Sequence, residues 1–324
     1  MNYRASKTFV WMMVMLAMLM GLLAGCTEPP SPTNVTASAA PTTQRPTATP
    51  TAIPTQPPTQ PTQPATQPTQ PAPQPTEPPA PEDPVPEALR NNYYLGSKGY
   101  GACAEMTGNI HLLIVFVSDS ISKWTEGDIL ETKNAFADHE TKLEEAATQR
   151  GAKMDVSMSY LEATISTEFR DDGKVLTSAY TTMRKLGMGD AFYDQDSLEE
   201  QYGANAVPIL FVLNRQGRAF AVAVDAQTES LECAVIFSKD MSSVRHELYH
   251  IFGAQDFYFP DETVAAQEKY LPDSVMNNHY KDVVDDLTAF LIGWVDELSD
   301  NAIKFLQATN HLTKEEIEDA RAEN

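Results

Sequence analysis

Proline is nearly absent from the last 234 residues of this 324-residue chain, which contain only three. The other 20 prolines lie between Pro29 and Pro86, and glycine is missing from residues 27–86 altogether. A segment of repeated Pro, Thr and Gln cannot form a packed core and favours extended conformations. We therefore expect residues 26–90 to form a disordered stalk, which at ~3.1 Å per residue reaches about 150 Å or more. Residues 91–324 are expected to be the one folded domain.

Basic residues are also scarce. Residues 91–324 contain 19 Lys and Arg against 40 Asp and Glu, and the whole chain has a formal net charge of −22. Because an acidic surface repels a polyanion, nucleic acid is excluded as a partner. The same charge keeps the domain soluble, and it favours a monomer with cationic or neutral substrates.

Long hydrophobic runs are missing, with one exception from Phe9 to Leu23. Basic residues precede this run, and it is short for a stable membrane span, so residues 1–25 are predicted to be an export signal peptide. Leu23-Ala24-Gly25-Cys26 resembles the lipobox of bacterial lipoprotein signal peptides. The resemblance implies cleavage before Cys26 and a lipid on its thiol, which would hold the domain on the extracytoplasmic side of the cell membrane. An ordinary secretory signal and an uncleaved anchor are the alternatives.

The chain has only three cysteines. With Cys26 assigned to the lipid, Cys103 and Cys233 remain as an even pair in an exported domain, which favours a disulfide between them. Two unpaired buried thiols are the alternative, because the sequence does not give the Cα separation that a bridge requires.

The folded domain alternates between strand and helix patterns. Residues 109–117 form a nearly continuous apolar run that suits a central strand, and the helical pattern that follows begins near Thr125 and extends to about Gln149. Gly217 indicates a hairpin turn between strands at 207–213 and 218–224. The other expected strands are 154–163 and 234–238, and the other expected helices are 173–186, 242–252, 287–294 and 314–322.

The helix expected at 242–252 contains His246-Glu247-Leu248-Tyr249-His250, the H-E-x-x-H pattern. Residues four apart project from the same face of a helix, so both imidazoles can reach one ion. Zinc suits these ligands, and Glu247 lies close enough to a water on the ion to accept its proton. We therefore expect His246 and His250 to bind Zn²⁺ and Glu247 to be the catalytic general base.

A glycine and an aspartate extend the pattern to H-E-x-x-H-x-x-G-x-x-D, at Gly253 and Asp256. Gly253 can end the helix in a left-handed conformation, which turns the chain back so that Asp256 reaches the metal from a different direction. Three protein ligands leave one position for water, as in catalytic zinc sites. The alternative is that Asp256 is a surface turn residue and that His279 or Glu262 is the third ligand.

The extended motif resembles that of the metzincin clan of zinc endopeptidases. The clan's consensus ends in a third histidine, and Asp256 makes this sequence similar to the snapalysin-type minority, in which aspartate is the third ligand. The segment Asp273-Ser274-Val275-Met276-Asn277 resembles the methionine-containing turn beneath the metal, with Met276 as its methionine. The resemblance implies an α+β, zincin-like fold with a twisted, mostly parallel sheet, an antiparallel edge strand, an active-site helix and a helical C-terminal subdomain.

The implied activity is zinc-dependent hydrolysis of peptide bonds in a peptide or protein substrate. An extended substrate would pair with the edge strand at 218–224, and Tyr258 or Tyr280 would donate a hydrogen bond to the developing oxyanion. We interpret His111 and His139 as structural or solvent-facing, because they lack ligand spacing. Two other classes remain open: a surface-displayed binding or adhesion lipoprotein with a non-catalytic zinc site, and a zinc hydrolase that acts on cell-wall peptide.

Overall fold

The computed structural model describes residues 84–101, 103–170, 173–190, 192, 194–223 and 232–323. The expected signal peptide at 1–25, the lipid site at Cys26 and most of the stalk lie outside the described residues. Among the helices that the structure describes, none combines the length and the apolar character needed to cross a membrane.

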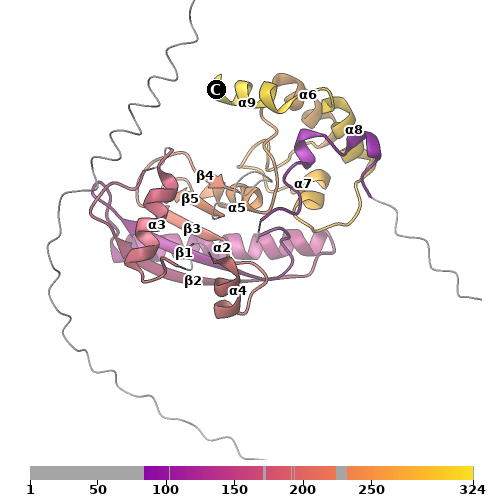
Figure 1. Ribbon diagram of the computed structural model, residues 1–324. Coiled ribbons are helices and arrows are strands. Elements are labelled where there is room, and N and C mark those ends of the chain that lie inside the picture. The colour runs from indigo at the N-terminus through magenta and orange to yellow at the C-terminus, as the bar shows by residue number, and fades with distance from the viewer. Residues whose placement is uncertain are drawn as a thin grey trace, which may run out of the picture. The chain divides into compact units, whose positions relative to one another are not determined.

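A five-stranded sheet organises the described domain, with the strand order β2-β1-β3-β5-β4 (Figure 1). Neighbouring strands are parallel except at β4, which lies at the edge and is antiparallel to β5. This confirms the expected α+β arrangement of a mostly parallel sheet with an antiparallel edge strand. The strands are β1 (Gly108–Ser118), β2 (Met154–Thr164), β3 (Ile209–Leu213), β4 (Phe220–Val222) and β5 (Cys233–Phe237).

The central strands are buried on both faces. β1 contains eight consecutive buried residues, and every residue of β3 and β5 is buried. Unbroken apolar runs of this kind are typical of parallel strands that are covered on both sides. β4 is only half-buried along its length, as suits an edge strand.

The expected hairpin between residues 207–213 and 218–224 is wrong. β3 pairs with β1 on one side and β5 on the other, so β5 separates β3 from β4. The fully buried run of β3 suits a strand in the middle of the sheet that is covered on both faces, whereas the half-buried β4 suits the edge of the sheet. The local turn signal at Gly217 does not determine which strand becomes the partner.

Helix α2 (Glu126–Gln149) begins where its sequence predicts. The Thr125 side chain accepts from the backbone N–H of Asp128, and the Asp128 side chain accepts from the N–H of Thr125, which makes a capping box. α2 packs against β2 and contacts α5 (Val244–Ile251), and α3 (Val175–Lys185) also packs against β2. A short helix, α4 (Gln195–Tyr202), was not expected from the sequence.

After α5 the chain forms a second layer of short helices, α6 (Asp261–Tyr270), α7 (Asp286–Leu291), α8 (Asp300–Thr309) and α9 (Lys314–Glu323) (Figure 1). The N-terminal segment joins this layer. Tyr94 is fully buried with its ring 5.7 Å from Phe257 and 5.2 Å from Phe305, and its hydroxyl lies 2.6 Å from Thr263 Oγ1. Residues 252–323 together with 84–98 are called the site layer below.

Cys103 and Cys233 are free cysteines and are fully buried, so the expected disulfide is not formed in this structure. Cys233 begins β5 and is fixed by the sheet. The backbone N–H of Cys103 donates to the carboxylate of Glu232, the residue before Cys233, at 2.7 Å, and Gln195 Nε2 lies 3.6 Å from the Cys103 sulfur. The even cysteine count therefore does not imply pairing here, and the alternative of two buried thiols matches the structure.

Candidate metal centre

Helix α5 presents one face to the core and another to a cleft. Val244, Leu248 and Ile251 are almost fully buried, and their spacing of four and three residues defines the core face. His246 and His250 are four residues apart and share a different face. Because α5 packs against β4 and β5, the sheet fixes the position of both histidines.

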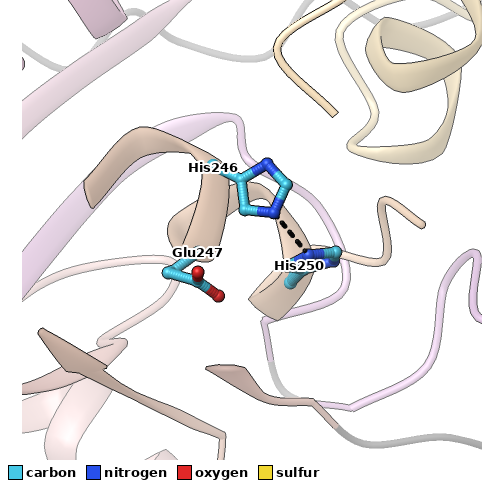
Figure 2. Close-up of side chains that lie close together, drawn as sticks. All are labelled: His246, Glu247 and His250. Carbon is cyan, nitrogen blue, oxygen red and sulfur yellow. Dashed lines mark hydrogen bonds between the residues drawn. The ribbon is translucent and has the colours of Figure 1, made fainter. Parts of the chain in front are cut away.

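Two ring nitrogens and a carboxylate oxygen meet beside this helix. His246 Nε2 and His250 Nε2 lie 3.1 Å apart (Figure 2). Asp256 Oδ1 lies 3.2 Å from the first nitrogen and 2.9 Å from the second. Nitrogen and oxygen ligands at about 2.0–2.2 Å from a tetrahedral zinc ion are separated by about 3.3–3.6 Å. The three atoms therefore have nearly the spacing of zinc ligands.

Backbone carbonyls hold the other ring nitrogens. His246 Nδ1 lies 3.0 Å from the carbonyl oxygen of Val275, and His250 Nδ1 lies 2.8 Å from that of Ala254. Because a carbonyl can only accept, each Nδ1 carries the proton of the neutral ring and each Nε2 presents a lone pair to the shared point. Histidines that bind metals are commonly oriented in this way.

Gly253 turns the chain so that Asp256 approaches from outside the helix. Its φ is +95°, in the left-handed region that the sequence predicted, and its N–H donates to the His250 carbonyl at 3.0 Å. A Cβ at this position would lie 2.9 Å from the backbone oxygen of Ser97. Both the backbone conformation and the close approach of the N-terminal segment therefore require glycine.

Asp256 Oδ1 is a buried acceptor that faces the two histidines. Asp256 is 7% exposed, and this oxygen has no hydrogen bond of suitable geometry within the described residues, although both Nε2 atoms are close. A buried carboxylate oxygen is costly unless a donor or a cation compensates it. Two imidazole nitrogens and one carboxylate oxygen around one point fit a metal ion that takes nitrogen and oxygen ligands, as zinc does.

The charges of these groups are coupled. Burial lowers the pKa of His250, but the Asp256 carboxylate outweighs burial and raises that pKa to about 9. Burial raises the pKa of Asp256, but His250 and His246 hold it well below its ordinary value. A cation that binds at neutral pH would therefore displace a proton from this group.

Glu247 lies beside the two histidines (Figure 2). It offers a carboxylate oxygen within 4.8 Å of ligand atoms on His246 and His250, so these three residues could also hold a metal ion. Asp256 Oδ1 also lies within 3.2 Å of the Nε2 atoms of both histidines, so the site offers two carboxylates. Burial raises the pKa of Glu247, and the two histidines oppose that shift. A carboxyl group with a raised pKa is suited to accept and return a proton near neutrality.

The site opens into a cleft of about 1120 Å³. Its walls come from the segment that precedes β4 and β4 itself, from α5, from the N-terminal segment of the site layer and from α9 with the residues before it. The lining residues are 90–93, 96, 97, 218–223, 246, 247, 250, 254–256, 258, 312–314, 318 and 321. β4 pairs with β5 and with no other strand that the structure describes, so the wall includes the edge strand of the described sheet.

Tyr258 also lies in the cleft. Its ring centroid is 6.2 Å from that of His246, and Arg218 Nη2 lies 3.4 Å from its hydroxyl. Burial and the nearby Asp256 carboxylate raise the pKa of Tyr258 to about 12. The phenol therefore keeps its proton at neutral pH and is available as a hydrogen-bond donor.

The segment expected to form the methionine turn lies against the site. The backbone oxygen of Met276 accepts from the N–H of Phe257 at 3.1 Å, and the neighbouring Val275 carbonyl orients His246. Met276 is fully buried, so the segment is anchored in the core. Asp273, at its start, has a φ of 62°.

The other candidates from the sequence are His279, Glu262 and Tyr280. The His279 ring centroid is 6.3 Å from that of His246, and His279 Nε2 is 3.9 Å from Asp240. Glu262 is exposed in the first turn of α6, and Tyr280 is 70% exposed with its ring against His279. None of the three lines the cleft that the structure describes.

The two histidines interpreted as structural or solvent-facing are both buried. His111 lies 2.8 Å from Ser157 Oγ and 2.9 Å from Ser159 Oγ through its two ring nitrogens. His139 is buried in α2. Neither belongs to the group of residues that could hold a metal in the described part of the chain, so the structural interpretation is retained.

The structure places two arginines at the site that no motif in the sequence indicated. Arg218 lies next to Tyr258, and Arg321 of α9 contacts Asp256. Arg321 is 65 residues from Asp256, so no local spacing connects them. Only the three-dimensional position of α9 reveals this contact.

No protein-family model and no curated protein matches the chain. Among solved structures, the chain is similar to the crystal structure of metalloproteinase-II from Bacteroides fragilis, with a TM-score of 0.33 and 14% sequence identity. The match covers 68% of this chain and 60% of that one, so the chain spans less than two thirds of that protein's length. Because both the TM-score and the identity are low, the function is inferred from the geometry of the site.

Proposed function

We propose that this chain is a zinc-dependent endopeptidase. The observation that carries the proposal is the meeting of His246 Nε2, His250 Nε2 and Asp256 Oδ1 within 3.2 Å of one another at the wall of a large cleft. Three protein ligands leave a coordination position open, which is the pattern of a catalytic rather than a structural zinc site. Glu247, on the same helix, supplies the acid-base group that a purely structural or adhesive zinc site does not need.

In the proposed reaction, the residues of the site have separate roles. His246, His250 and Asp256 would hold the ion, which when bound supplies Lewis acidity toward a carbonyl and lowers the pKa of water. Glu247 accepts the proton of the attacking water and returns it to the amine that leaves as the peptide bond breaks. Tyr258, which remains protonated at neutral pH, donates a hydrogen bond to the oxygen that becomes negative.

The proposed substrate is an extended peptide or a protein segment. β4 lines the cleft and is the edge strand of the described sheet, so a peptide would add to it as a further strand. Backbone hydrogen bonds would provide much of the affinity, and side-chain preference would come from the other walls of the cleft. This binding mode favours cleavage within a chain over removal of single terminal residues.

The proposed location is the outer side of a cell membrane. It rests on the resemblance of Leu23-Ala24-Gly25-Cys26 to a lipobox and on the proline-rich composition of residues 26–90. A lipid on Cys26 would anchor the chain, and the stalk would let a monomeric domain reach substrates away from the membrane. Incorporation of labelled fatty acid, and its loss in Cys26→Ser, tests this part.

Glu247→Gln tests the function itself. This variant should retain stoichiometric zinc but lose about 10²- to 10⁴-fold of its cleavage rate on a broad peptide library, because the proton acceptor is gone. Glu262→Gln removes a carboxylate at an exposed site and is the matched control, with zinc content and cleavage unchanged. A zinc-loaded chain that cleaves none of the peptides, or a fully active Glu247→Gln variant, would refute the proposal.

The third ligand is tested by zinc retention. Asp256→Ala should weaken zinc binding more than 100-fold, since loss of a ligand exceeds the effect typical of outer-shell changes. His279→Ala and Glu262→Ala should leave it unchanged, because neither side chain reaches the two histidine Nε2 atoms. If Asp256→Ala retains zinc fully and His279→Ala or Glu262→Ala loses it, the residue changed in the variant that loses zinc is the third ligand.

A further inference from the structure

The C-terminal helix α9 places an arginine on the carboxylate that faces the metal site. Arg321 Nη2 donates to Asp256 Oδ2, and the two side chains form an ion pair. The other oxygen of the same carboxylate, Oδ1, is the one that lies near His246 and His250. The two oxygens of Asp256 are therefore assigned to different partners.

Arg321 is held in place by more than this ion pair. Its guanidinium carbon lies 5.8 Å from the centroid of the Phe259 ring, which provides a cation–π contact. Ile317, one helical turn earlier, is buried with 3% exposure and anchors α9. The start of α9 is capped, because Thr313 Oγ1 accepts from the Glu316 N–H at 3.2 Å and Glu316 accepts from the Thr313 N–H at 2.9 Å.

A carboxylate that binds a metal ion through one oxygen needs its other oxygen to be satisfied. Asp256 is attached to the turn after Gly253 and not to a regular helix or strand, so its side chain is less constrained than the two histidines. The Arg321 contact fixes the rotation of the carboxylate and leaves Oδ1 directed at the two histidine nitrogens. The carbonyls of Val275 and Ala254 orient the histidines in the same manner.

We infer that Arg321 is a positioning residue of the metal centre, which acts by orienting Asp256 as the third ligand. The inference rests on the proposed metal site. It adds that the last helix of the described chain completes the centre, so that each of the three ligands has its own orienting partner. A guanidinium is suited to this role because it keeps its charge and offers donors in a fixed geometry.

Zinc affinity, measured by competition with a chelator of known affinity, tests the inference without relying on activity. Arg321→Ala should bind zinc about 10- to 100-fold more weakly, the range typical when an outer-shell partner of a ligand is removed. Arg321→Lys keeps the charge and should recover part of the loss. Arg184→Ala is the matched control, because Arg184 of α3 also lies 5.8 Å from an aromatic ring, that of Tyr180, and should bind zinc as the unmodified chain does.

A double-mutant cycle shows whether Arg321 acts through Asp256. In the Asp256→Ala background, Arg321→Ala should have no further effect on zinc affinity, and the visible spectrum of the cobalt-loaded chain should change alike in both single variants. An equal loss in both backgrounds would mean that Arg321 acts through the fold, and unchanged or tighter zinc binding in Arg321→Ala would also overturn the inference. If Asp256→Ala itself binds zinc normally, the proposed set of ligands is wrong. Failure of the proposed metal site can therefore be distinguished from failure of the inference about Arg321.

Discussion

The sheet and the site layer are held together in different ways. In the sheet, β1, β3 and β5 contribute unbroken rows of buried apolar residues. In the site layer, buried polar side chains connect short helices to the segments around them. The Asp285 carboxylate accepts from Ser274 and Thr288 at 2.6 Å each, and the Asn92 side chain donates to the Leu306 carbonyl at 2.9 Å.

The proposed metal centre lies where these two regions meet. His246 and His250 belong to a helix that packs on the sheet, whereas Asp256, Val275 and Arg321 belong to the site layer. Changes in the apolar sheet should therefore reduce stability and leave the metal affinity of the folded protein nearly intact. Changes in the polar contacts of the site layer should reduce both.

Phe211→Ala should have the largest effect on stability. Phe211 is fully buried in β3 and its ring lies 5.5 Å from that of Phe169, so truncation leaves a cavity worth about 3–5 kcal/mol of unfolding free energy. Urea unfolding with and without zinc should give the same loss. Tyr280→Ala, at a 70% exposed ring, is the control and should stay within about 0.5 kcal/mol. A tenfold fall in the zinc affinity of folded Phe211→Ala would show that the sheet also determines metal affinity, contrary to this comparison.

Asp285→Ala should cost about 2–4 kcal/mol, from a lost helix cap and from hydroxyls left without an acceptor. Asp285 caps α7 and also accepts from Ser274 Oγ, which in turn accepts from the Met276 N–H at 3.1 Å. Because this segment carries the carbonyl that orients His246, zinc affinity should fall as well.

Ser299→Ala provides the control for Asp285→Ala, since it removes the cap of α8 without touching the turn around Met276. It should cost about 1 kcal/mol and leave zinc affinity unchanged. Both quantities can be measured on the same samples by urea unfolding and chelator competition. Equal zinc affinities in the two variants would show that the turn does not support the metal centre.

The sheet region was largely predictable because its signals are local. The capping box at Thr125 and the apolar run of β1 lie within short windows of sequence, and both elements are where we expected them. The pairing of β3 was not predictable from Gly217, because the partner of a strand depends on what covers its edges. Helix α6 was missed because its buried residues are Thr263, Ala266 and Gln267, two of them polar, which give no clear apolar period. Helix α8 was also missed, although Ser299 caps it and it has an apolar face.

The close approach of the three proposed metal ligands was predictable for a similar reason. His246, His250 and Asp256 lie within one short segment, and the physical demands of a helix and a glycine turn link them. Their orienting partners lie far away in sequence, at Val275 and Arg321, and no spacing rule connects them to the motif. The site layer thus contributes the part of the site that only the tertiary structure reveals.

The same substitution at two glycines compares the regions directly. Gly151, after α2, has a φ of +77° with nothing near the position of a Cβ, whereas Gly253 has a φ of +95° and the Ser97 carbonyl oxygen at 2.9 Å from that position. Gly151→Ala should cost about 1–2 kcal/mol from the left-handed backbone alone. Gly253→Ala should cost more, because Ser97 must also move, and it should weaken zinc binding because Asp256 shifts. If Gly151→Ala and Gly253→Ala lower the free energy of unfolding equally and zinc affinity is unchanged, the contact between Ser97 and Gly253 supports neither stability nor the proposed site.

The smallest expected effect is a pH dependence that arises in the sheet region, at His139 of α2. Burial, with a contribution from the nearby Arg245, lowers the pKa of His139 to about 4. Below the ordinary histidine pKa of about 6.5 the unfolded chain binds a proton that the folded chain refuses, so stability falls as the pH drops from about 6.5 toward 4. The expected loss through this residue between pH 7 and 5.5 is about 1 kcal/mol.

His139→Gln should remove that part of the acid destabilisation, seen as the difference between the urea-unfolding curves of the variant and the unmodified chain at each pH. His311→Gln is the control, because it replaces an exposed histidine before α9. It should leave the change of unfolding free energy with pH as it is in the unmodified chain. The proposed metal ligands are present in all three proteins, so their titration cancels in the differences. If His139→Gln and the unmodified chain lose stability in parallel between pH 7 and 5.5, the buried histidine of the sheet region is not the source, and the acid sensitivity belongs to the site layer.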